Sequence, residues 1–248
     1  MSQVTITRGD DGVATVTADR PPANAMDVTL LRDLVGAIEE VADDPPPAVV
    51  LAGRPGFFSA GADLKAVPGY GPEDQRAMVD GINRMALDVY ALPCPVVGAI
   101  TGHAIAGGLV LAICTDLRVA SSEGRYGLTE VKVGVPYPQG AIGVVQAELA
   151  PQAVRRLAFG NELHDAQTCL ALGVFDEVVE PDGVLPRAQE IARDLAALPA
   201  DVYARTKRDL RGALVDRLRA AAADDPLLAR WVTRADPSEW EVTLPTAY

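Results

Sequence analysis

Residues 102–116, GHAIAGGLVLAICTD, form the stretch that decides the fold. The apolar run before it, PVVGAIT (95–101), is short and continuous, which is typical of a strand buried on both faces. Residues 102–108 are predicted to form a glycine-rich turn, and residues 109–114 a wholly apolar helix. The next run, DLRVA (116–120), predicts another strand. Strands that alternate with helices in this way indicate an α/β protein.

A segment of similar design lies upstream. The apolar run AVVLA (48–52) is followed by a turn and then by FFSAGADL (57–64), with a helix start expected at Ala62 and Asp63. Backbone N–H groups at a helix start lack intrahelical partners and can bind a negative group. Two such ends that converge would form an oxyanion hole, which needs small residues for close approach. The alternative is that these glycines only allow close packing of helix on strand.

The N-terminal segments agree with an α/β fold. Residues 4–17 alternate between apolar and polar positions around a Gly/Asp turn, which predicts a β-hairpin. Asp27 is expected to cap a helix whose apolar positions follow the 3.6-residue period until the prolines at 45–47.

Helices are expected to dominate the rest of the chain. A loop at 67–72 precedes a helix that is predicted to end near Tyr90 and to carry Met78, Ile82, Met85 and Val89 inward. The further predictions are helices at 151–159, 165–172, 184–198 and 201–222, with a short strand at 174–179. No low-complexity linker separates two domains. Residues 1–195 are therefore predicted to form the core, and residues 196–248 a helical region of the same unit.

Composition excludes several classes of partner. The chain of 248 residues carries a formal net charge of −12, which argues against binding to nucleic acid or to an anionic membrane. No run approaches the roughly 18 apolar residues of a membrane span, and the first residues show no signal-peptide pattern. A cytoplasmic protein is expected. The three cysteines form no CxxC pair and the two histidines suggest no zinc site, so we predict neither a disulfide nor a metal.

Other catalytic motifs are missing from the sequence. The spacing of Gly102, Gly107 and Gly108 is GxxxxGG rather than the GxGxxG of dinucleotide-binding proteins. Neither a phosphate-binding GxxxxGK[ST] loop nor a GxSxG nucleophile turn is found. Ser59 is therefore interpreted as a small loop residue.

Three blocks in this order resemble the enoyl-CoA hydratase/isomerase (crotonase) superfamily: FFSAGADL, GHAIAGGLVLAICTD and YGLTEVKVGVPYP (126–138). RPPANA (20–25) is similar to an early segment of the same family. The resemblance implies a fold of repeated ββα units, a helical C-terminal trimerisation region, and a homotrimer or dimer of trimers. It also implies an acyl-CoA thioester substrate, with coenzyme A as part of the substrate and no separate cofactor.

The resemblance assigns roles residue by residue. The backbone N–H groups of Ala62 and Gly107 would form the oxyanion hole that stabilises a thioester enolate. Residues that would contact the substrate are Ala23, Ala60, Asp63, Leu64 and Lys65, the last of them near the phosphates. The last thirty residues of the chain, which end in ADPSEWEVTLPTAY, depart from the usual helical tail of the family.

The family position of each catalytic acid decides the expected reaction. Hydratases of the family usually have two glutamates, and these positions match Val110 and Glu130 here. Glutamate is usually a solvated surface residue, and only the resemblance turns Glu130 into a catalytic candidate. Apolar neighbours such as Val110 should raise the pKa of Glu130 toward neutrality. One carboxylate suffices to move a proton between C2 and C4, so we predict a Δ3-Δ2-enoyl-CoA isomerase.

Three other functions stay open at this point. Hydration of a 2-enoyl-CoA is the first alternative, although it usually uses two carboxylates. Tyr137 resembles a tyrosine of family decarboxylases, which lack the glutamate present here. The absence of a carboxylate at Val110 would also suit a catalytically weak acyl-CoA-binding subunit.

Overall fold

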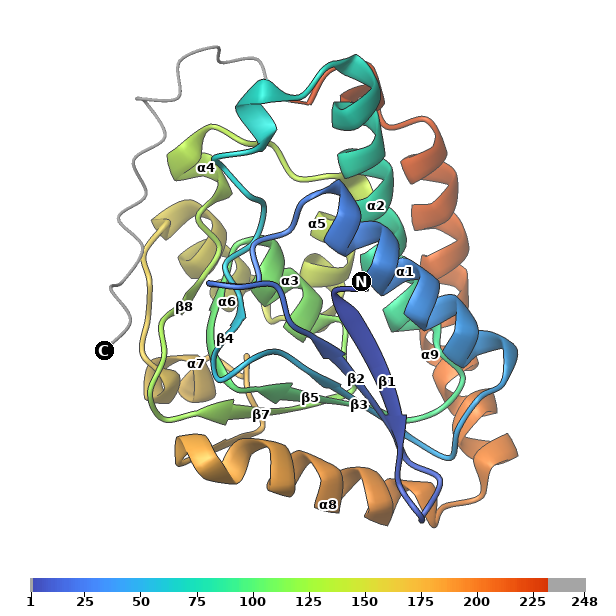
Figure 1. Ribbon diagram of the computed structural model, residues 1–248. Helices are drawn as coiled ribbons and strands as arrows, with labels where there is room; N and C mark the ends of the chain where they lie inside the picture. The colour runs from blue at the N-terminus through green and yellow to red at the C-terminus, as the bar shows by residue number, and fades with distance from the viewer. Residues whose placement is uncertain (1, 232–248) are drawn as a thin grey trace.

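The computed structural model describes residues 2–231, and its centre is a twisted, mixed β-sheet (Figure 1). The six strands have the order β1-β2-β3-β5-β7-β9. Only β1 and β2 are antiparallel, and they form the expected hairpin; the other pairs are parallel. The strands are β1 (Val4–Arg8), β2 (Ala14–Ala18), β3 (Val49–Ala52), β5 (Val96–Ile100), β7 (Leu117–Ser121) and β9 (Glu177–Val179).

Helices cover both faces of this sheet. The amphipathic helix α8 (Val184–Ala196) lies on one face, where Val184 and Ala188 pack on β-strand residues such as Val50 and Val97 (Figure 1). The opposite face is covered by α1 (Val28–Asp43), α2 (Pro72–Ala91), α3 (Gly107–Ile113), α5 (Gln139–Glu148) and α9 (Ala200–Ala223). Burial on both faces explains why the central strands consist of continuous apolar runs.

Several local predictions are confirmed. Asp27 caps α1, since its Oδ1 accepts a hydrogen bond from the amide of Leu30 at 2.7 Å. Helix α2 buries Met78, Ile82 and Met85, as its apolar spacing predicted. The remaining helices are α4 (Glu130–Val133), α6 (Pro151–Val154), which continues as a π-helical turn (Arg155–Phe159), α7 (Ala166–Ala171) and the 3-10 turns η1 (Val67–Gly69), η3 (Pro181–Gly183) and η4 (Pro226–Leu228).

A second, three-stranded sheet corrects the prediction for residues 102–108. Its order is β4 (Gly56–Ser59), β6 (Gly102–Ile105) and β8 (Tyr126–Gly127), all parallel. Residues 102–105 are thus a strand rather than part of a turn. Gly102 lies directly against β4, where a Cβ would come within 2.1 Å of the Gly56 carbonyl carbon. This pairing depends on strands from distant parts of the chain, which local glycine content does not reveal.

The helix start expected at Ala62 and Asp63 is also wrong. Ala62 instead forms a parallel bridge with Met26, and only the short turn η1 follows. Helix α5 was not expected, because its sequence QGAIGVVQAE contains two glycines and is apolar on most faces. The division into residues 1–195 and 196–248 stays a prediction, and residues 232–248 of the unusual tail lie outside the described residues. Among residues 2–231, no helix combines the length and apolar character that crossing a bilayer requires.

Candidate active site

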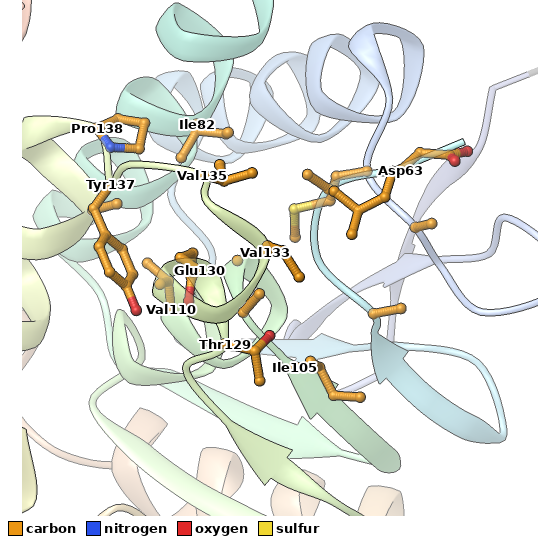
Figure 2. A pocket seen from close by; sticks show the side chains of 18 of the residues that line it. Asp63, Ile82, Ile105, Val110, Thr129, Glu130, Val133, Val135, Tyr137 and Pro138 are labelled. Atoms are coloured by element: carbon orange, nitrogen blue, oxygen red, sulfur yellow. The ribbon is translucent and has the colours of Figure 1, made fainter. Parts of the chain in front are cut away.

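A cavity of about 580 Å³ lies where the start of α3 meets the end of β4 (Figure 2). Every residue that the sequence assigned to the site lines this cavity. They are Ala23, Ala60, Ala62, Asp63, Leu64, Lys65, Gly107, Val110, Glu130 and Tyr137. Residues far apart in the sequence therefore meet at one place, as the family resemblance predicted.

The start of α3 exposes the Gly107 amide. Ala106 precedes it with φ 51°, a conformation that favours glycine, and its own N–H donates to the Gly127 carbonyl at 2.8 Å. Gly107 is the first residue of α3, so its N–H has no partner within the helix. None of the backbone hydrogen bonds within residues 2–231 uses this amide as a donor. The Gly107 N–H is thus available to a ligand in the cavity.

The Ala62 amide is free for a different reason. Its neighbours bond to Met26, because the Met26 amide donates to the Gly61 carbonyl at 2.7 Å and the Asp63 amide donates to the Met26 carbonyl at 2.9 Å. Successive amides of an extended chain point in opposite directions, so the Ala62 N–H points away from Met26. Strand pairing rather than a helix start leaves this donor open.

Glycines bring the two amides together. Gly61 has φ +77°, and a Cβ on it would lie 3.1 Å from the Gly107 nitrogen. Gly108 packs even more closely, since its Cβ would come within 2.2 Å of the Ser59 carbonyl oxygen. A Cβ on Gly107 would meet only ordinary contacts, the nearest at 3.5 Å. Both interpretations of the glycine segments therefore hold: Gly61 and Gly108 allow close packing, and Gly107 supplies an open amide.

Buried polar side chains hold the backbone around Gly61 in place. Asn24 is fully buried, and its Nδ2 donates to the Ala18 carbonyl at 2.8 Å and to the Phe58 carbonyl at 3.2 Å. The Ser59 hydroxyl donates to the Asn24 carbonyl at 2.7 Å and accepts from the Gly61 amide at 3.1 Å. Ser59 is thus engaged in holding the backbone, which agrees with its interpretation as a loop residue.

Glu130 is a buried carboxylate without a counter-ion. It is the first residue of α4 and only 7 % exposed, and its Oε2 has no hydrogen-bond partner among the described residues. Burial raises the pKa of Glu130 to about 7, against smaller lowering effects from the Tyr137 hydroxyl and nearby backbone amides. The shift has the direction that the sequence predicted. At neutral pH this group can both accept and release a proton.

Val110 and Tyr137 surround the carboxylate (Figure 2). Val110 lies one turn after Gly107 and is 1 % exposed, so it presents an apolar surface. The Tyr137 hydroxyl is buried beside the Glu130 carboxylate, near enough to affect its pKa, although the contact falls outside hydrogen-bond geometry. Burial, followed by the neighbouring charge of Glu130, raises the pKa of Tyr137, which keeps the hydroxyl protonated at neutral pH.

The opposite side of the cavity is polar. Asp63 lies across the cavity from Tyr137 in Figure 2. Its Oδ2 accepts a hydrogen bond from Arg20 Nη2 at 2.8 Å, and its Oδ1 accepts from the Lys65 amide at 3.0 Å. The Asp63 carboxylate is therefore fully engaged, while the Lys65 side chain is exposed at the rim. Arg20 also pairs with Asp27, at 3.1 Å between Nε and Oδ2, so of the two cations among the described residues that line the cavity the exposed Lys65 is the one left for an anionic ligand.

The thiols and imidazoles lie away from the reaction chemistry. Burial raises the pKa of Cys94 to about 11 and that of Cys169 to about 12, and all three cysteines are free. His103 Nδ1 accepts from the Arg125 amide at 2.9 Å, and neither histidine lines the cavity. Among the described residues, no three His, Cys, Asp or Glu side chains are placed to hold a metal ion.

Sequence reasoning missed part of the cavity wall. The additional lining residues are mostly apolar: Arg20, Pro22, Ala25, Met26, Ile82, Ile105, Ala106, Thr129, Val133, Val135, Pro136, Pro138, Ala141 and Trp231. Ile82 was predicted only to point inward from its helix. Nothing in the sequence indicated that Trp231 lines the cavity, because this residue follows the last helix and belongs to no periodic pattern.

The mixed α/β fold and this cavity define an enzyme of the crotonase superfamily. Residues 8–236 match the family model for enoyl-CoA hydratase/isomerase. A probable enoyl-CoA hydratase of Mycobacterium tuberculosis, EchA17, is 35 % identical over 201 residues, which cover 80 % of this chain and 76 % of the relative. The chain therefore belongs to the enoyl-CoA hydratase/isomerase family, whose substrates are acyl-CoA thioesters.

Solved structures agree with this assignment. An enoyl-CoA hydratase from Mycobacterium ulcerans, EchA3, superposes with a TM-score of 0.83 at 32 % identity, covering 89 % of this chain and 96 % of that chain. Human mitochondrial Δ3-Δ2-enoyl-CoA isomerase superposes with a TM-score of 0.82 at 27 % identity, covering 92 % and 90 % of the two chains. The relatives thus include proteins named as hydratases and as an isomerase.

Proposed function

We propose that this protein is a Δ3-Δ2-enoyl-CoA isomerase in which Glu130 moves one proton between C2 and C4 of the acyl group. One observation carries the proposal. Of the two carboxylates that line the described cavity, Asp63 is paired with Arg20, whereas Glu130 has no counter-ion and faces Val110. A single unpaired carboxylate of near-neutral pKa suits a reversible proton shuttle.

The proposed reaction has two proton transfers. The Glu130 carboxylate removes a proton from C2 of a 3-enoyl-CoA, and the electron pair of that C–H bond moves into the thioester carbonyl. The resulting dienolate oxygen accepts hydrogen bonds from the amides of Ala62 and Gly107. Glu130 then delivers the same proton to C4, while the double bond forms between C2 and C3. No atom is gained or lost, and the carboxylate returns to its initial state.

The remaining residues of the site bind or position the substrate. Lys65 would attract the phosphates of coenzyme A at the polar side of the cavity, next to Ala23, Ala60 and Leu64. The Tyr137 hydroxyl, protonated and close to Glu130, is suited to orient the carboxylate. No cofactor beyond the coenzyme A of the substrate is required by this scheme.

Hydration of a 2-enoyl-CoA is the second candidate, and the names of several relatives favour it. Hydration needs a water held beside C3, and an ordered water needs 2–4 polar partners. Val110 provides none, so Glu130 alone would have to hold the water, activate it and then protonate C2 of the acyl group. Decarboxylation, which Tyr137 suggests, ranks third, because the family decarboxylases lack the glutamate that is present here. A catalytically weak binding subunit is a further outcome of the test below.

The test compares two substrates in wild type and two Val110 variants. Wild type should isomerise a 3-enoyl-CoA much faster than it hydrates a 2-enoyl-CoA. Val110→Glu restores a second carboxylate one turn after Gly107 and should raise the hydratase-to-isomerase ratio by about tenfold, less than a complete site would give because no supporting hydrogen bonds orient the new group. Val110→Gln is the matched control without the charge. A wild-type ratio above one would favour hydratase, and acyl-CoA binding without either reaction would favour the binding subunit.

We also propose a cytoplasmic homotrimer or dimer of trimers. Exposed apolar side chains support assembly: Phe159 is 76 % exposed, and Val202 and Leu210 on α9 are 58 % and 80 % exposed. Closed symmetric assembly would cover such groups. Light scattering at micromolar concentration tests this, and a strictly monomeric species would contradict it.

A further inference from the structure

We infer that Trp231 is a specificity-determining residue that closes the apolar side of the cavity and limits the length of the acyl chain. The inference rests on the proposed acyl-CoA ligand, but not on the choice of isomerase over hydratase. Trp231 is 2 % exposed and lines the same cavity as Glu130. It reaches this position from a part of the chain that follows α9 and η4.

The indole is held in a defined orientation. Its Nε1–H donates to the Pro136 carbonyl at 2.9 Å. This bond satisfies the polar edge of the ring, so the remaining surface of the indole is free to pack as an apolar group. Pro136 directly precedes Tyr137, and the bond therefore places Trp231 on the side of the cavity opposite Asp63 and Lys65.

The segment that carries Trp231 is tied to the same loop a second time. Asp225 is 3 % exposed, and its Oδ2 accepts from the Gln139 amide, the first residue of α5, at 2.8 Å. Its Oδ1 accepts a hydrogen bond from the Leu227 amide at 3.0 Å, and this bond caps the start of the turn η4. Hydrogen bonds at Pro136 and Gln139 thus hold both ends of the Tyr137 segment to residues 225–231.

The consequence for the ligand follows from size and position. Tryptophan is the largest side chain in the cavity lining, and it stands on the apolar side, where the acyl chain beyond C4 must go if C2 and C4 lie at Glu130. The volume that the indole fills is closed to further methylene groups. Removing the ring should extend the apolar compartment, and longer chains should gain affinity.

The experiment measures binding rather than turnover. Dissociation constants of butyryl-, octanoyl- and dodecanoyl-CoA are determined by calorimetry for wild type, Trp231→Phe, Trp231→Ala and Leu227→Ala. Leu227 belongs to the same segment but does not line the cavity, so it controls for general loosening. Each additional pair of buried methylenes should tighten binding on the order of tenfold.

In Trp231→Ala, the affinity for dodecanoyl-CoA relative to butyryl-CoA should therefore rise about tenfold or more. Trp231→Phe keeps most of the packing and should give a rise of a few-fold, and Leu227→Ala should leave the ratio unchanged. An unchanged ratio in a folded Trp231→Ala variant overturns the inference. If that variant does not fold, an unchanged ratio in Trp231→Phe overturns it. Failure of wild type to bind any acyl-CoA would instead contradict the proposed ligand, and binding without isomerisation would contradict only the proposed reaction.

Discussion

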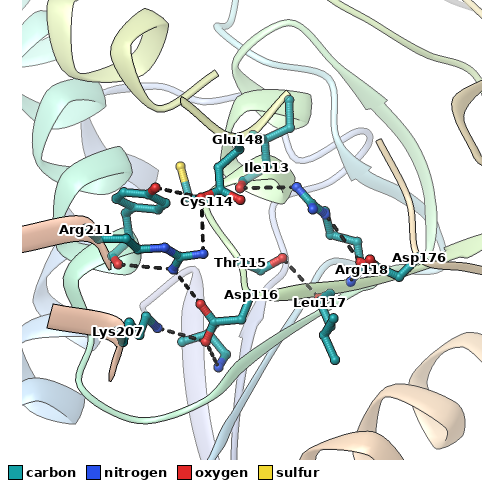
Figure 3. Close-up of polar contacts among 12 residues, drawn as sticks. Ile113, Cys114, Thr115, Asp116, Leu117, Arg118, Glu148, Asp176, Lys207 and Arg211 are labelled. Carbon is teal, nitrogen blue, oxygen red and sulfur yellow. Dashed lines mark hydrogen bonds and ion pairs between the residues drawn. The ribbon is translucent and has the colours of Figure 1, made fainter. Parts of the chain in front are cut away.

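Two buried carboxylates of this molecule have opposite surroundings. Asp116, directly before β7, accepts hydrogen bonds from Lys207 Nζ at 2.8 Å and from Arg211 Nη1 at 2.5 Å (Figure 3). It also accepts one from the Tyr203 hydroxyl at 3.1 Å. The Asp116 side chain is 9 % exposed, and Glu130 is 7 % exposed, yet the Oε2 of Glu130 has no partner among the described residues.

The neighbours of Asp116 extend the paired cluster. Arg211 also lies 3.3 Å from a carboxylate oxygen of Glu148, and its guanidinium stacks 4.1 Å from the centre of the Tyr90 ring. These contacts hold α9 against α2 and α5, the helices that carry Tyr90 and Glu148. The Asp116 cluster is therefore part of the scaffold.

The difference between the two carboxylates shows how burial can serve either stability or chemistry. Burying a charge without partners is costly, and the group responds by holding its proton more tightly. At Asp116 cationic partners offset this cost, whereas at Glu130 the pKa rises to about 7. A paired carboxylate keeps the fold in place, and an unpaired one is ready to exchange a proton.

The largest effect is expected from Glu130→Gln. The amide keeps the volume but cannot act as a base, so kcat/KM for a 3-enoyl-CoA should fall by about 10²–10⁴. Exchange of the C2 proton in D₂O should stop, while a saturated acyl-CoA should still bind. Proton exchange at the wild-type rate would show that another group acts as the base.

Asp116→Asn tests the other half of the comparison. Removing this charge leaves the buried Lys207 without its counter-ion, and the free energy of unfolding should fall by about 3–5 kcal/mol. Denaturation with urea measures the loss. Asp209→Asn is the control, since its exposed pair with Arg205 should contribute only about 0.3–0.5 kcal/mol. If both variants lose the same small amount, the Asp116 cluster does not stabilise the fold.

The open amide of Gly107 is the next test of the unpaired groups. Gly107→Pro removes the N–H and should lower kcat/KM by about 10²–10³, the usual effect of losing an oxyanion donor. Gly107→Ala keeps the N–H, and its Cβ would meet only ordinary contacts, the Met26 sulfur at 3.5 Å and the Gly61 Cα at 3.7 Å, so its activity should stay within a few-fold of wild type. A folded proline variant with near-normal turnover would place the oxyanion donor elsewhere.

The smallest effect concerns stability and pH. Because the pKa of Glu130 is raised from 4.5 to about 7 in the folded state, the folded protein binds this proton more tightly than the unfolded chain. The resulting stabilisation is fully present below pH 4.5 and is lost as the pH rises through 7. As the pH rises from 4.5 to above 7, the free energy of unfolding of wild type should therefore fall by roughly 1–3 kcal/mol relative to that of Glu130→Gln.

Chemical denaturation of both proteins at several pH values measures this difference. The same substitution at the exposed Glu162 controls for the loss of one negative charge. If the free energies of unfolding of wild type and Glu130→Gln differ by the same amount from pH 4 to pH 8, the result would contradict an unpaired carboxylate at this position.

Much of the fold was predictable because its elements are local. The Asp27 cap, the hairpin and the inward face of α2 follow from capping chemistry and periodicity. The predictions failed at β6 and at Ala62, where strand pairing overrides the local preference. A two-residue strand such as β8 likewise has no sequence signal of its own, since it forms only against β6.

The candidate site was predictable for a different reason. The family resemblance assigned Ala62, Gly107, Val110 and Glu130 to one site, and all four line one cavity. The local pattern around Ala62 had implied a helix start where the structure has a strand-like bridge. The motifs contained no sign of Trp231, whose contribution depends on where the chain goes after α9.

The sequence by itself determined the local chemistry of this protein: which runs are apolar, where helices are capped, and that one family position carries Glu130 while the other carries Val110. Only the tertiary structure decided which distant groups meet. It set Met26 beside Ala62, Gly61 against Gly107, Lys207 against Asp116, and Trp231 against Pro136. The physical reason is that hydrogen bonding and burial depend on neighbours in space, and those neighbours are separated in the sequence by spans over which no periodic pattern extends.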